Sequence, residues 1–345
     1  MCAKPAASPQ TARALNFAAR LAALLCVYLF FAVLTPGNKG FTSDANTQLM
    51  LQDIAVVAMC AIGMTMIIIS GGIDLSAGST IALSMITTAY VLNLGPKGAE
   101  YVRQYPVLMP MAAVGAAMAV SGLVGALNGI LVTSLRIVPF IVTLGTMQMA
   151  RGLAKLVANE QNIYPPSDVV GDLWIARLLD PAKSILTFPF LPPAVWIVIF
   201  SAVLAALFLR YTRLGRHFFA VGSNEKTALL CGVPVFKTKF LVYVIGGVFS
   251  GLAGVIFFAR LGAIGQPTEA IGFELFVIAA VVIGGASLLG GRGTILGTMI
   301  GALIITILRN GGVKMGWPQY TQEIVMGAVI VVAVVIDNLR NRRRA

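Results

Sequence analysis

The chain has 345 residues, of which 58% are hydrophobic and 11% are charged, whereas soluble domains have roughly 25% charged residues. This composition excludes an ordinary soluble protein and indicates an integral membrane protein. The net charge of +12 is typical of the basic cytoplasmic loops of membrane proteins and does not by itself indicate a nucleic acid partner. The 4 cysteines and the single histidine show no metal-ligand spacing, so we expect neither a metal nor a cofactor.

Apolar runs long enough to cross a bilayer recur along the whole chain. A hydrocarbon core about 30 Å thick requires roughly 20 apolar residues in a helix. The first run follows several basic residues, but no small-x-small cleavage site comes after it, so we interpret it as an uncleaved span. The expected fold is an all-α polytopic membrane protein with about ten spans, at residues 17–35, 49–70, 74–94, 107–134, 139–158, 192–209, 239–260, 273–289, 294–310 and 320–338.

Basic residues assign the two sides of the membrane, because cytoplasmic loops carry an excess of Lys and Arg. The decisive basic segments are 210–238 and the terminal sequence RNRRRA. Both fall on the cytoplasmic side when the number of spans is even and both termini are inside. We therefore expect a cytoplasmic tail at 1–16, a single transmembrane domain at 17–338 and a basic cytoplasmic tail at 339–345.

The sequence SGGIDLSAGS interrupts the apolar pattern and places Asp74 between two almost wholly apolar flanks. Gly71 and Gly72 can end a helix by accepting positive φ, and Asp74 or Ser76 can cap the next helix. Two interpretations stay open. Asp74 is either a helix cap at a hinge or a side chain that faces a polar translocation path, since ionisable residues within spans are usually functional.

A similar pattern recurs in VVIGGASLLGGRGTILGTMI, where Gly284 and Gly285 separate an apolar run from a segment rich in small residues. Transporter folds are often built from such repeats, with glycine-interrupted helices at the binding site. On the predicted topology both breaks face the same side. A polar path through the bundle also needs hydrogen-bonding groups, and further candidates are Ser70, Asn128, Thr143, Thr146 and Gln148.

The connection at 210–238 is long and carries its own helical pattern, which is typical of a functional loop. Ser223 or Asn224 can cap a short helix that begins at Glu225, and Gly232 can end it. The sequence contains no nucleotide-binding, zinc-protease or serine-nucleophile motif, and the Gly-Lys dipeptide of a phosphate-binding loop never occurs. We therefore expect no catalytic residue and no ATP hydrolysis by this chain alone.

These segments resemble the permease subunits of bacterial ATP-binding cassette (ABC) importers for monosaccharides, a family that serves ribose, arabinose, xylose, galactose and related sugars. The resemblance runs from the first span to the last. The segments that carry it are SGGIDLSAGS, GALNGILVT, RIVPFIVTLGTMQMARGLA, GRHFFAVGSNEKTALLCGVPV and ELFVIAAVVIGGASLLGGRGTILGTMIGALI.

The resemblance implies a permease in the bacterial inner membrane that translocates a ribose-like pentose or a hexose. Its partners would be a cytoplasmic ABC ATPase, a periplasmic sugar-binding protein and a second permease, either an identical copy or a paralogue. Residues 215–233 would couple the permease to the ATPase. Lys226 and Thr227 depart from the family pattern, which bears on the choice of ATPase. The residues that match it are Gly215, Arg216, Gly222, Asn224, Glu225, Ala228 and Gly232.

Three other functions are weighed against this one. In a secondary transporter, Asp74 would bind a proton or an ion and cycle with the substrate. A membrane-embedded enzyme would need clustered His, Asp or Ser in facing spans, which a single histidine does not favour. An ABC permease for amino acids or nucleosides would share the glycine-broken helices, but the close match of 271–301 to the sugar branch favours a sugar.

Overall fold

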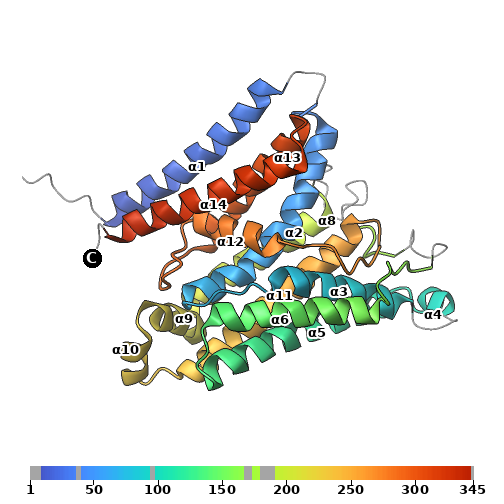
Figure 1. Cartoon of the computed structure of the whole chain (residues 1–345), viewed down its shortest axis with the longest axis horizontal. Coiled ribbons are helices and arrows are strands. Elements are labelled where there is room, and N and C mark those ends of the chain that lie inside the picture. The colour runs from blue at the N-terminus through green and yellow to red at the C-terminus, as the bar shows by residue number, and fades with distance from the viewer. Residues whose placement is uncertain (1–8, 36–39, 94–97, 167–172, 179–190, 343–345) are drawn as a thin grey trace, which may run out of the picture.

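The computed structural model describes residues 9–35, 40–93, 98–166, 173–178 and 191–342, which contain α-helices and no β-strand. Figure 1 shows the helices lying mostly lengthwise in one bundle. In chain order they are α1 (Pro9–Leu34), α2 (Asp44–Ile69), α3 (Ala77–Leu92), α4 (Gly98–Gln104), α5 (Leu108–Ser134), α6 (Pro139–Val157), α8 (Pro193–Tyr211), α9 (Arg213–Ser223), α10 (Glu225–Leu230), α11 (Val235–Arg260), α12 (Phe273–Ile283), α13 (Ile295–Lys314) and α14 (Gln319–Arg342).

Seven helices of the described part are long and apolar enough to cross a membrane, namely α1, α2, α5, α8, α11, α13 and α14. Two further apolar helices, α3 and α12, have only 16 and 11 residues. The helix α6 carries the charged residues Arg151 and Lys155 in its second half. The prediction of an all-α polytopic membrane protein is confirmed, whereas the count of ten spans stays a prediction.

Two predicted span boundaries were wrong at the glycine breaks. The helix α3 begins at Ala77 rather than at residue 74, because an irregular turn around Asp74 precedes it. The helix α12 ends at Ile283 rather than at residue 289, because Gly284 and Gly285 follow and Gly285 takes a φ of 87°. The helix α3 therefore begins later, and α12 ends earlier, than the apolar runs of the sequence indicate.

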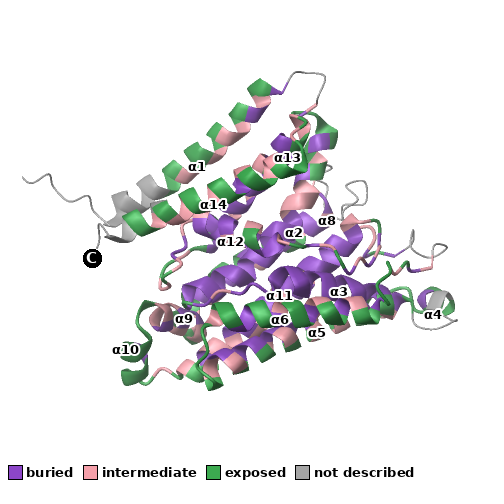
Figure 2. Cartoon of the chain, in the orientation of Figure 1, coloured by how far each residue is buried: buried purple, intermediate pink, exposed green. Residues whose placement is uncertain are grey.

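The most deeply buried part of the bundle consists of α2, α3 and α11, with α5 packed against α3 and α11 (Figure 2). Every residue of α2 from Ala55 to Ile69 is buried. Small residues permit this packing, since a Cβ added to Gly125 of α5 would lie 2.9 Å from the carbonyl carbon of Tyr243 on α11. The hydrophobic effect does not drive helices together within lipid. Van der Waals contacts between closely approaching backbones, such as this one, therefore stabilise their packing.

Two helices at the periphery, α1 and α14, expose most of their apolar side chains and pack against α13 and α12 respectively. At this side of the bundle a buried amide pair joins α2 to α13. The Asn46 side-chain amide donates to Asn310 Oδ1 at 2.9 Å, and the Asn310 amide donates back to Asn46 Oδ1 at 3.0 Å. Each buried amide therefore satisfies the other.

Both ends of the described chain lie at the end of the bundle that carries α9 and α10, where α1 begins and α14 ends (Figure 1). We call this the coupling end, and it also holds the short link between α5 and α6 at 135–138. The helices continue into both predicted tails, and the outermost residues, 1–8 and 343–345, lie outside the described residues. The start of α1 and the end of α14 lie at the same end of the bundle, which agrees with an even number of membrane crossings.

Candidate functional site

The first glycine break ends α2 by a compact turn. The backbone N–H groups of Gly71 and Gly72 donate to the carbonyl oxygens of Ile68 and Ile67, both at 3.0 Å. Gly71 has a φ of 81°, as predicted for a helix-ending glycine, but Gly72 is not in the left-handed region. Gly72 is needed for space instead, because an added Cβ would lie 2.6 Å from Tyr243 Oη.

Asp74 follows this break and is 2% exposed. Its Oδ1 accepts hydrogen bonds from the backbone N–H of Ser76 at 2.8 Å and from the Ser76 hydroxyl at 2.6 Å. Ser76 is the N-cap residue of α3, but its side chain makes no capping bond. Of the two predicted capping side chains, Asp74 therefore holds the turn, and Ser76 extends the polar contacts into the bundle.

A chain of hydrogen bonds runs from Asp74 across three helices. Asn128 of α5 donates through Nδ2 to Ser76 Oγ at 2.9 Å. Thr146 of α6 donates through Oγ1 to Asn128 Oδ1 at 2.5 Å. All four side chains are buried, and we call Asp74, Ser76, Asn128 and Thr146 the Asp74 network. Beside it, Thr143 donates to the carbonyl oxygen of Ile73 at 3.5 Å.

The Asp74 network lies inside the bundle rather than at its rim. Thr146 is about two turns from the first residue of α6, and Asn128 is nearly two turns from the last residue of α5. At 1.5 Å per residue, both side chains lie about 10 Å from the coupling end. Irregular backbone at membrane depth is tolerated inside protein or at a polar cavity, and here the turn at Asp74 is buried within the bundle. Its carboxylate, hydroxyl and amide groups are the hydrogen-bonding types that can bind a polar solute.

The second glycine break follows α12 and makes different contacts. An added Cβ on Gly284 would lie 2.6 Å from the Gly297 carbonyl oxygen of α13, and the Arg20 guanidinium of α1 fills the space beside Gly285. The carboxylate of Asp337 on α14 accepts a hydrogen bond from Ser287 Oγ at 3.1 Å in the same loop. The predicted residues Gly284 and Gly285 thus form a break, but it belongs to the contacts of α1, α13 and α14 and not to the Asp74 network.

The backbones of both break regions and of α9 contact one another at four glycines. We call these residues, Gly71, Gly222, Gly290 and Gly291, the glycine junction. The backbone N–H of Gly291 donates to the Ile69 carbonyl oxygen at 2.8 Å. A Cβ on Gly222 would lie 2.7 Å from Gly291 N, and one on Gly290 would lie 2.5 Å from the Gly222 carbonyl oxygen. Sequence analysis singled out Gly71 and Gly222 but missed Gly290 and Gly291, whose signal was the second Gly-Gly pair in LLGGRG.

The coupling segment at 210–238 contains two helices where one was predicted. The helix α10 begins at Glu225 and is capped by Asn224, whose Oδ1 accepts from Thr227 N–H at 3.0 Å, so Ser223 is not the cap. Gly232 follows with a φ of 77°. The missed helix, α9, is capped by Thr212, and within it the predicted residue Gly215 packs against α8.

The coupling segment presents an exposed surface at the coupling end. Arg216 and Glu225 are exposed, and Leu229 and Leu230 are 64% and 88% exposed, while Ala228 is buried beneath them. Glu225 accepts a charged hydrogen bond from Lys239 Nζ of α11 at 2.6 Å. We call Arg216, Glu225, Leu229 and Leu230 the coupling surface. A groove of about 440 Å³ lies between α10, the start of α11 and the link between α5 and α6.

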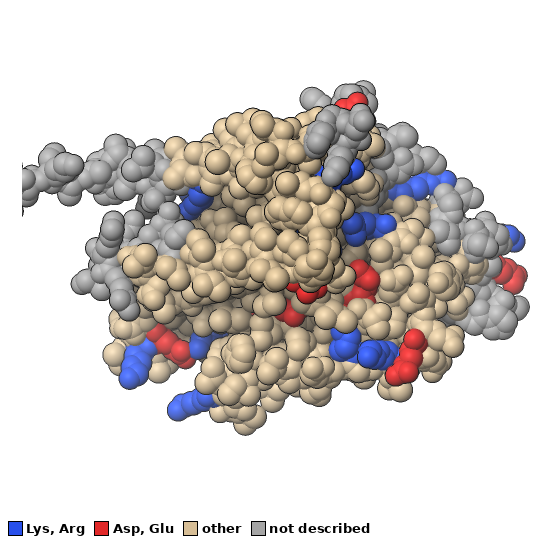
Figure 3. All heavy atoms as spheres, turned by 45° about the horizontal axis from the view of Figure 1, so that its top comes forward, with Lys and Arg blue, Asp and Glu red and all other residues tan. Residues whose placement is uncertain are grey.

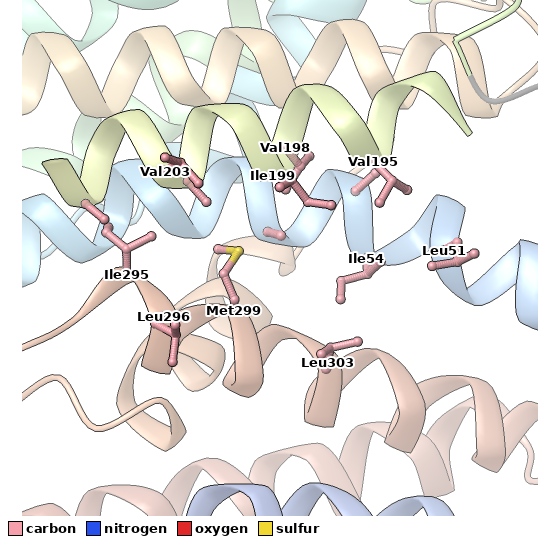
Figure 4. Close-up of a pocket in the computed structure, with 14 residues that line it drawn as sticks. Leu51, Ile54, Val195, Val198, Ile199, Val203, Ile295, Leu296, Met299 and Leu303 are labelled. Atoms are coloured by element: carbon pink, nitrogen blue, oxygen red, sulfur yellow. The ribbon is translucent and has the colours of Figure 1, made fainter. Parts of the chain in front are cut away.

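A second groove, of about 390 Å³, lies between α2, α8 and α13 and is lined only by apolar side chains. Figure 4 shows Ile54, Val198 and Met299 among the residues that line it. It offers no side-chain hydrogen-bond partner, so it does not suit a hydroxylated solute. Within the described residues, no group of three or more His, Cys, Asp or Glu is placed to hold a metal ion.

The fold and the site define a class of protein: a multi-pass membrane protein with a buried polar network at a helix break and an exposed helical segment at one end. Residues 46–334 match the family described as branched-chain amino acid transport system / permease component. The chain therefore belongs to this permease family of ABC transporters.

Individual relatives match over nearly the whole chain. The ribose import permease protein RbsC of Escherichia coli (strain K12) is 36% identical over 319 residues, 91% of this chain and 92% of that protein. RbsC of Bacillus subtilis (strain 168) is 36% identical over 322 residues, 93% and 94% of the two chains. The D-allose transport system permease protein AlsC of Escherichia coli (strain K12) is 35% identical over 317 residues, 92% and 90%. No solved structure matches the chain.

Proposed function

We propose that this chain is the permease subunit of an ABC importer that translocates a monosaccharide, either a ribose-like pentose or a hexose. The observation that carries the proposal is the match over more than nine tenths of the chain to permeases named for ribose and allose. The family description names branched-chain amino acids. We favour a sugar because the individual relatives at 35–36% identity are named for sugars.

The sequence lacks a phosphate-binding loop, so ATP hydrolysis falls to a partner subunit. We propose that this ATPase docks on the coupling surface. Leu229 and Leu230 are exposed apolar side chains in the same segment as the exposed charged residues Arg216 and Glu225, a combination typical of a protein contact. The coupling end, with both termini, then faces the cytoplasm of a bacterial cell, and a periplasmic sugar-binding protein delivers solute at the opposite end.

The glycine junction supports a route from the ATPase to the translocation path. Gly222 lies near the end of α9 and contacts the backbone at both helix breaks, at Ile69 and Gly291. Packed helices move as units between discrete arrangements. A tilt of α9 therefore displaces the end of α2, and with it the turn that holds Asp74 and Ser76. Two permease copies, identical or paralogous, would enclose the path between them.

Co-purification tests this proposal. The chain is purified in mild detergent from its native membranes, and subunits present in stoichiometric amount are identified. We expect an ATPase with a phosphate-binding loop, and we expect it to be lost when residues 223–230 are deleted while the permease stays inserted. A permease that comes alone and moves solute into liposomes without ATP would overturn the proposal. It would make Asp74 the candidate ion-binding group of a secondary transporter.

A further inference from the structure

The side of α6 that faces away from the bundle carries an amide near the middle of the membrane. Gln148 is exposed, and its side chain makes no hydrogen bond within the described part of the chain. Nine residues separate it from Pro139, the first residue of α6, so it lies about 14 Å from the coupling end. Because a hydrocarbon core is about 30 Å thick, this depth is close to the midplane of the bilayer.

An outward face with an amide at this depth differs from a face that suits lipid. Most of the surface in Figure 3 carries no charge, as expected of contact with hydrocarbon. The helix α8 shows such a face, because it exposes Phe200, Leu204 and Leu207 along its middle and end. An amide in hydrocarbon, by contrast, loses its hydrogen bonds to water and is unfavourable there unless another polar group replaces them. The exposed amide of Gln148 therefore indicates a contact with protein.

Two glycines lie on the same face of α6 as Gln148. Successive spacings of four, three and four residues separate Ile141, Gly145, Gln148 and Gly152, so all of them share one side of the helix (Figure 2). We call these four residues the α6 stripe. A Cβ added to Gly145 or Gly152 would meet no atom within 4 Å, unlike one added to Gly125, so packing within this chain does not require either glycine. Small residues on a membrane helix allow the backbone of another helix to approach closely.

A second copy of this chain fits the α6 stripe. Two copies that are inserted in the same direction are related by a twofold axis along the membrane normal, so each residue lies at the same depth in both. The two Gln148 side chains can then face each other, and each can donate through Nε2 and accept through Oε1. We propose that the α6 stripes of two identical copies pack against each other, with reciprocal hydrogen bonds between their Gln148 side chains.

The same reciprocal chemistry already joins two helices within this chain. Asn46 of α2 and Asn310 of α13 each donate to the side-chain oxygen of the other, at 2.9 and 3.0 Å. Both residues are buried, so the pair forms where the two helices pack. Gln148 carries the same amide group but has no hydrogen-bond partner among the described residues of its own copy. A second copy at the same depth supplies that partner.

The α6 contact agrees with a path that two copies enclose, and it rests on the proposed function in this respect. The opposite side of α6 carries Thr143 and Thr146, which are buried against the turn at Asp74. The helix therefore stands between the Asp74 network of its own copy and the second copy. Lys155 lies in the last turn of α6, where its long side chain can extend to the water outside the hydrocarbon core.

Cysteine cross-linking in native membranes tests the contact with the full chain and its natural partners present. The four natural cysteines are replaced by alanine, and Gln148→Cys is added. The matched control is Phe200→Cys, which is exposed on α8 and lies eleven residues before the end of that helix, about 16 Å from the coupling end. The two cysteines therefore have nearly the same depth in the membrane.

A mild oxidant is added, and linked dimers are separated from monomers by size. We expect Gln148→Cys to give linked dimers, because a disulfide needs Cα atoms within about 7 Å of each other. Phe200→Cys should stay monomeric. Absence of linked dimers in an inserted Gln148→Cys protein, or equal linking of both variants, would overturn the α6 contact.

A second experiment does not depend on cysteine chemistry. Two differently tagged copies are expressed together, and one is purified in mild detergent to measure how much of the other comes with it. Gly145→Leu adds a side chain to open space, so it leaves the fold of one copy intact but separates the two stripes. Gly327→Leu on α14 is the matched control, because that glycine is equally open and exposed.

We expect Gly145→Leu to lose most of the second copy and Gly327→Leu to retain it. Gln148→Leu removes the hydrogen bonds of both side chains, which should raise the dissociation constant of the dimer by about tenfold or more. Sedimentation equilibrium in detergent measures this constant. An unchanged constant for both Gly145→Leu and Gln148→Leu would contradict the proposed packing.

These experiments separate the α6 contact from the proposed function. If Gln148→Cys forms linked dimers but no ATPase co-purifies with the wild type, the contact stands and the proposed function fails. If the ATPase co-purifies but a paralogue, rather than a second copy of this chain, takes the place beside α6, the contact between identical copies fails and the proposed function stands.

Discussion

Gly222→Ala tests whether α9 drives the helix breaks through the glycine junction. The added Cβ would lie 2.7 Å from Gly291 N and 2.8 Å from the Ile69 carbonyl carbon, with the Ile69 oxygen closer still. Ordinary contact begins at 3.4 Å, so one side must move by about 0.7 Å or more. Both neighbours are backbone, and no side-chain rotation relieves the overlap.

The two energetic effects of Gly222→Ala have opposite signs. Alanine favours a helix over glycine by up to about 1 kcal/mol, whereas overpacking of a close contact costs about 1–3 kcal/mol. We therefore expect net destabilisation of the junction, with α9 shifted away from both breaks. At the upper end the net cost is about 2 kcal/mol, and if it is lost from the coupled conformation, uptake per ATP falls by up to about 30-fold, since 1.4 kcal/mol corresponds to a factor of ten.

The assay for Gly222→Ala measures ATP hydrolysis and sugar uptake in the same liposomes. We expect hydrolysis to persist while uptake falls. Gly115→Ala in α5 is the matched control, because no atom lies within 4 Å of the added Cβ there, and it should behave like the wild type. Full uptake by a well-expressed Gly222→Ala protein would refute the transmission of motion through the junction.

The remaining predictions concern three further contacts. For Asp74→Asn, an amide oxygen can still accept both hydrogen bonds that Ser76 now gives to Oδ1, so we expect uptake near the wild-type rate; an inactive but folded protein would instead indicate solute or ion contact. Glu225→Lys replaces the ion pair with Lys239 by two facing ammonium groups. It should abolish uptake while the permease stays inserted, which membrane fractionation checks, and normal uptake would exclude the coupling assignment. Asn310→Leu leaves a buried amide on α2 without its partner, which should cost about 1–3 kcal/mol and lower the thermal unfolding midpoint in detergent; an unchanged midpoint would argue against this pair.

Local signals allowed the helix breaks and the caps to be predicted. The φ preference of Gly71 and the capping oxygens of Asp74 and Asn224 act within a few residues of the chain, so their effects can be recognised in a sequence. The helix α9 was missed because its basic and glycine residues also suit a solvated loop, and Thr212 was not recognised as its cap.

Long-range contacts could not be predicted in the same way. The hydrogen bond from Asn128 to Ser76 joins positions 52 residues apart, and no periodicity in either segment specifies its partner. From the sequence, Arg260 at a helix end is indistinguishable from an ordinary interfacial anchor. Only the packing of α2 against α11 shows that Arg260 meets Asp53.

The most direct test of the central claim is the energy source of uptake. The permease, its co-purified ATPase and its binding protein are placed in liposomes, and entry of labelled D-ribose, D-allose and L-arabinose is measured with ATP, without ATP and with an uncoupler. The account predicts that at least one sugar enters only with ATP, that the uncoupler has no effect, and that deletion of residues 223–230 stops entry. Uptake that continues without ATP and collapses with the uncoupler would contradict it.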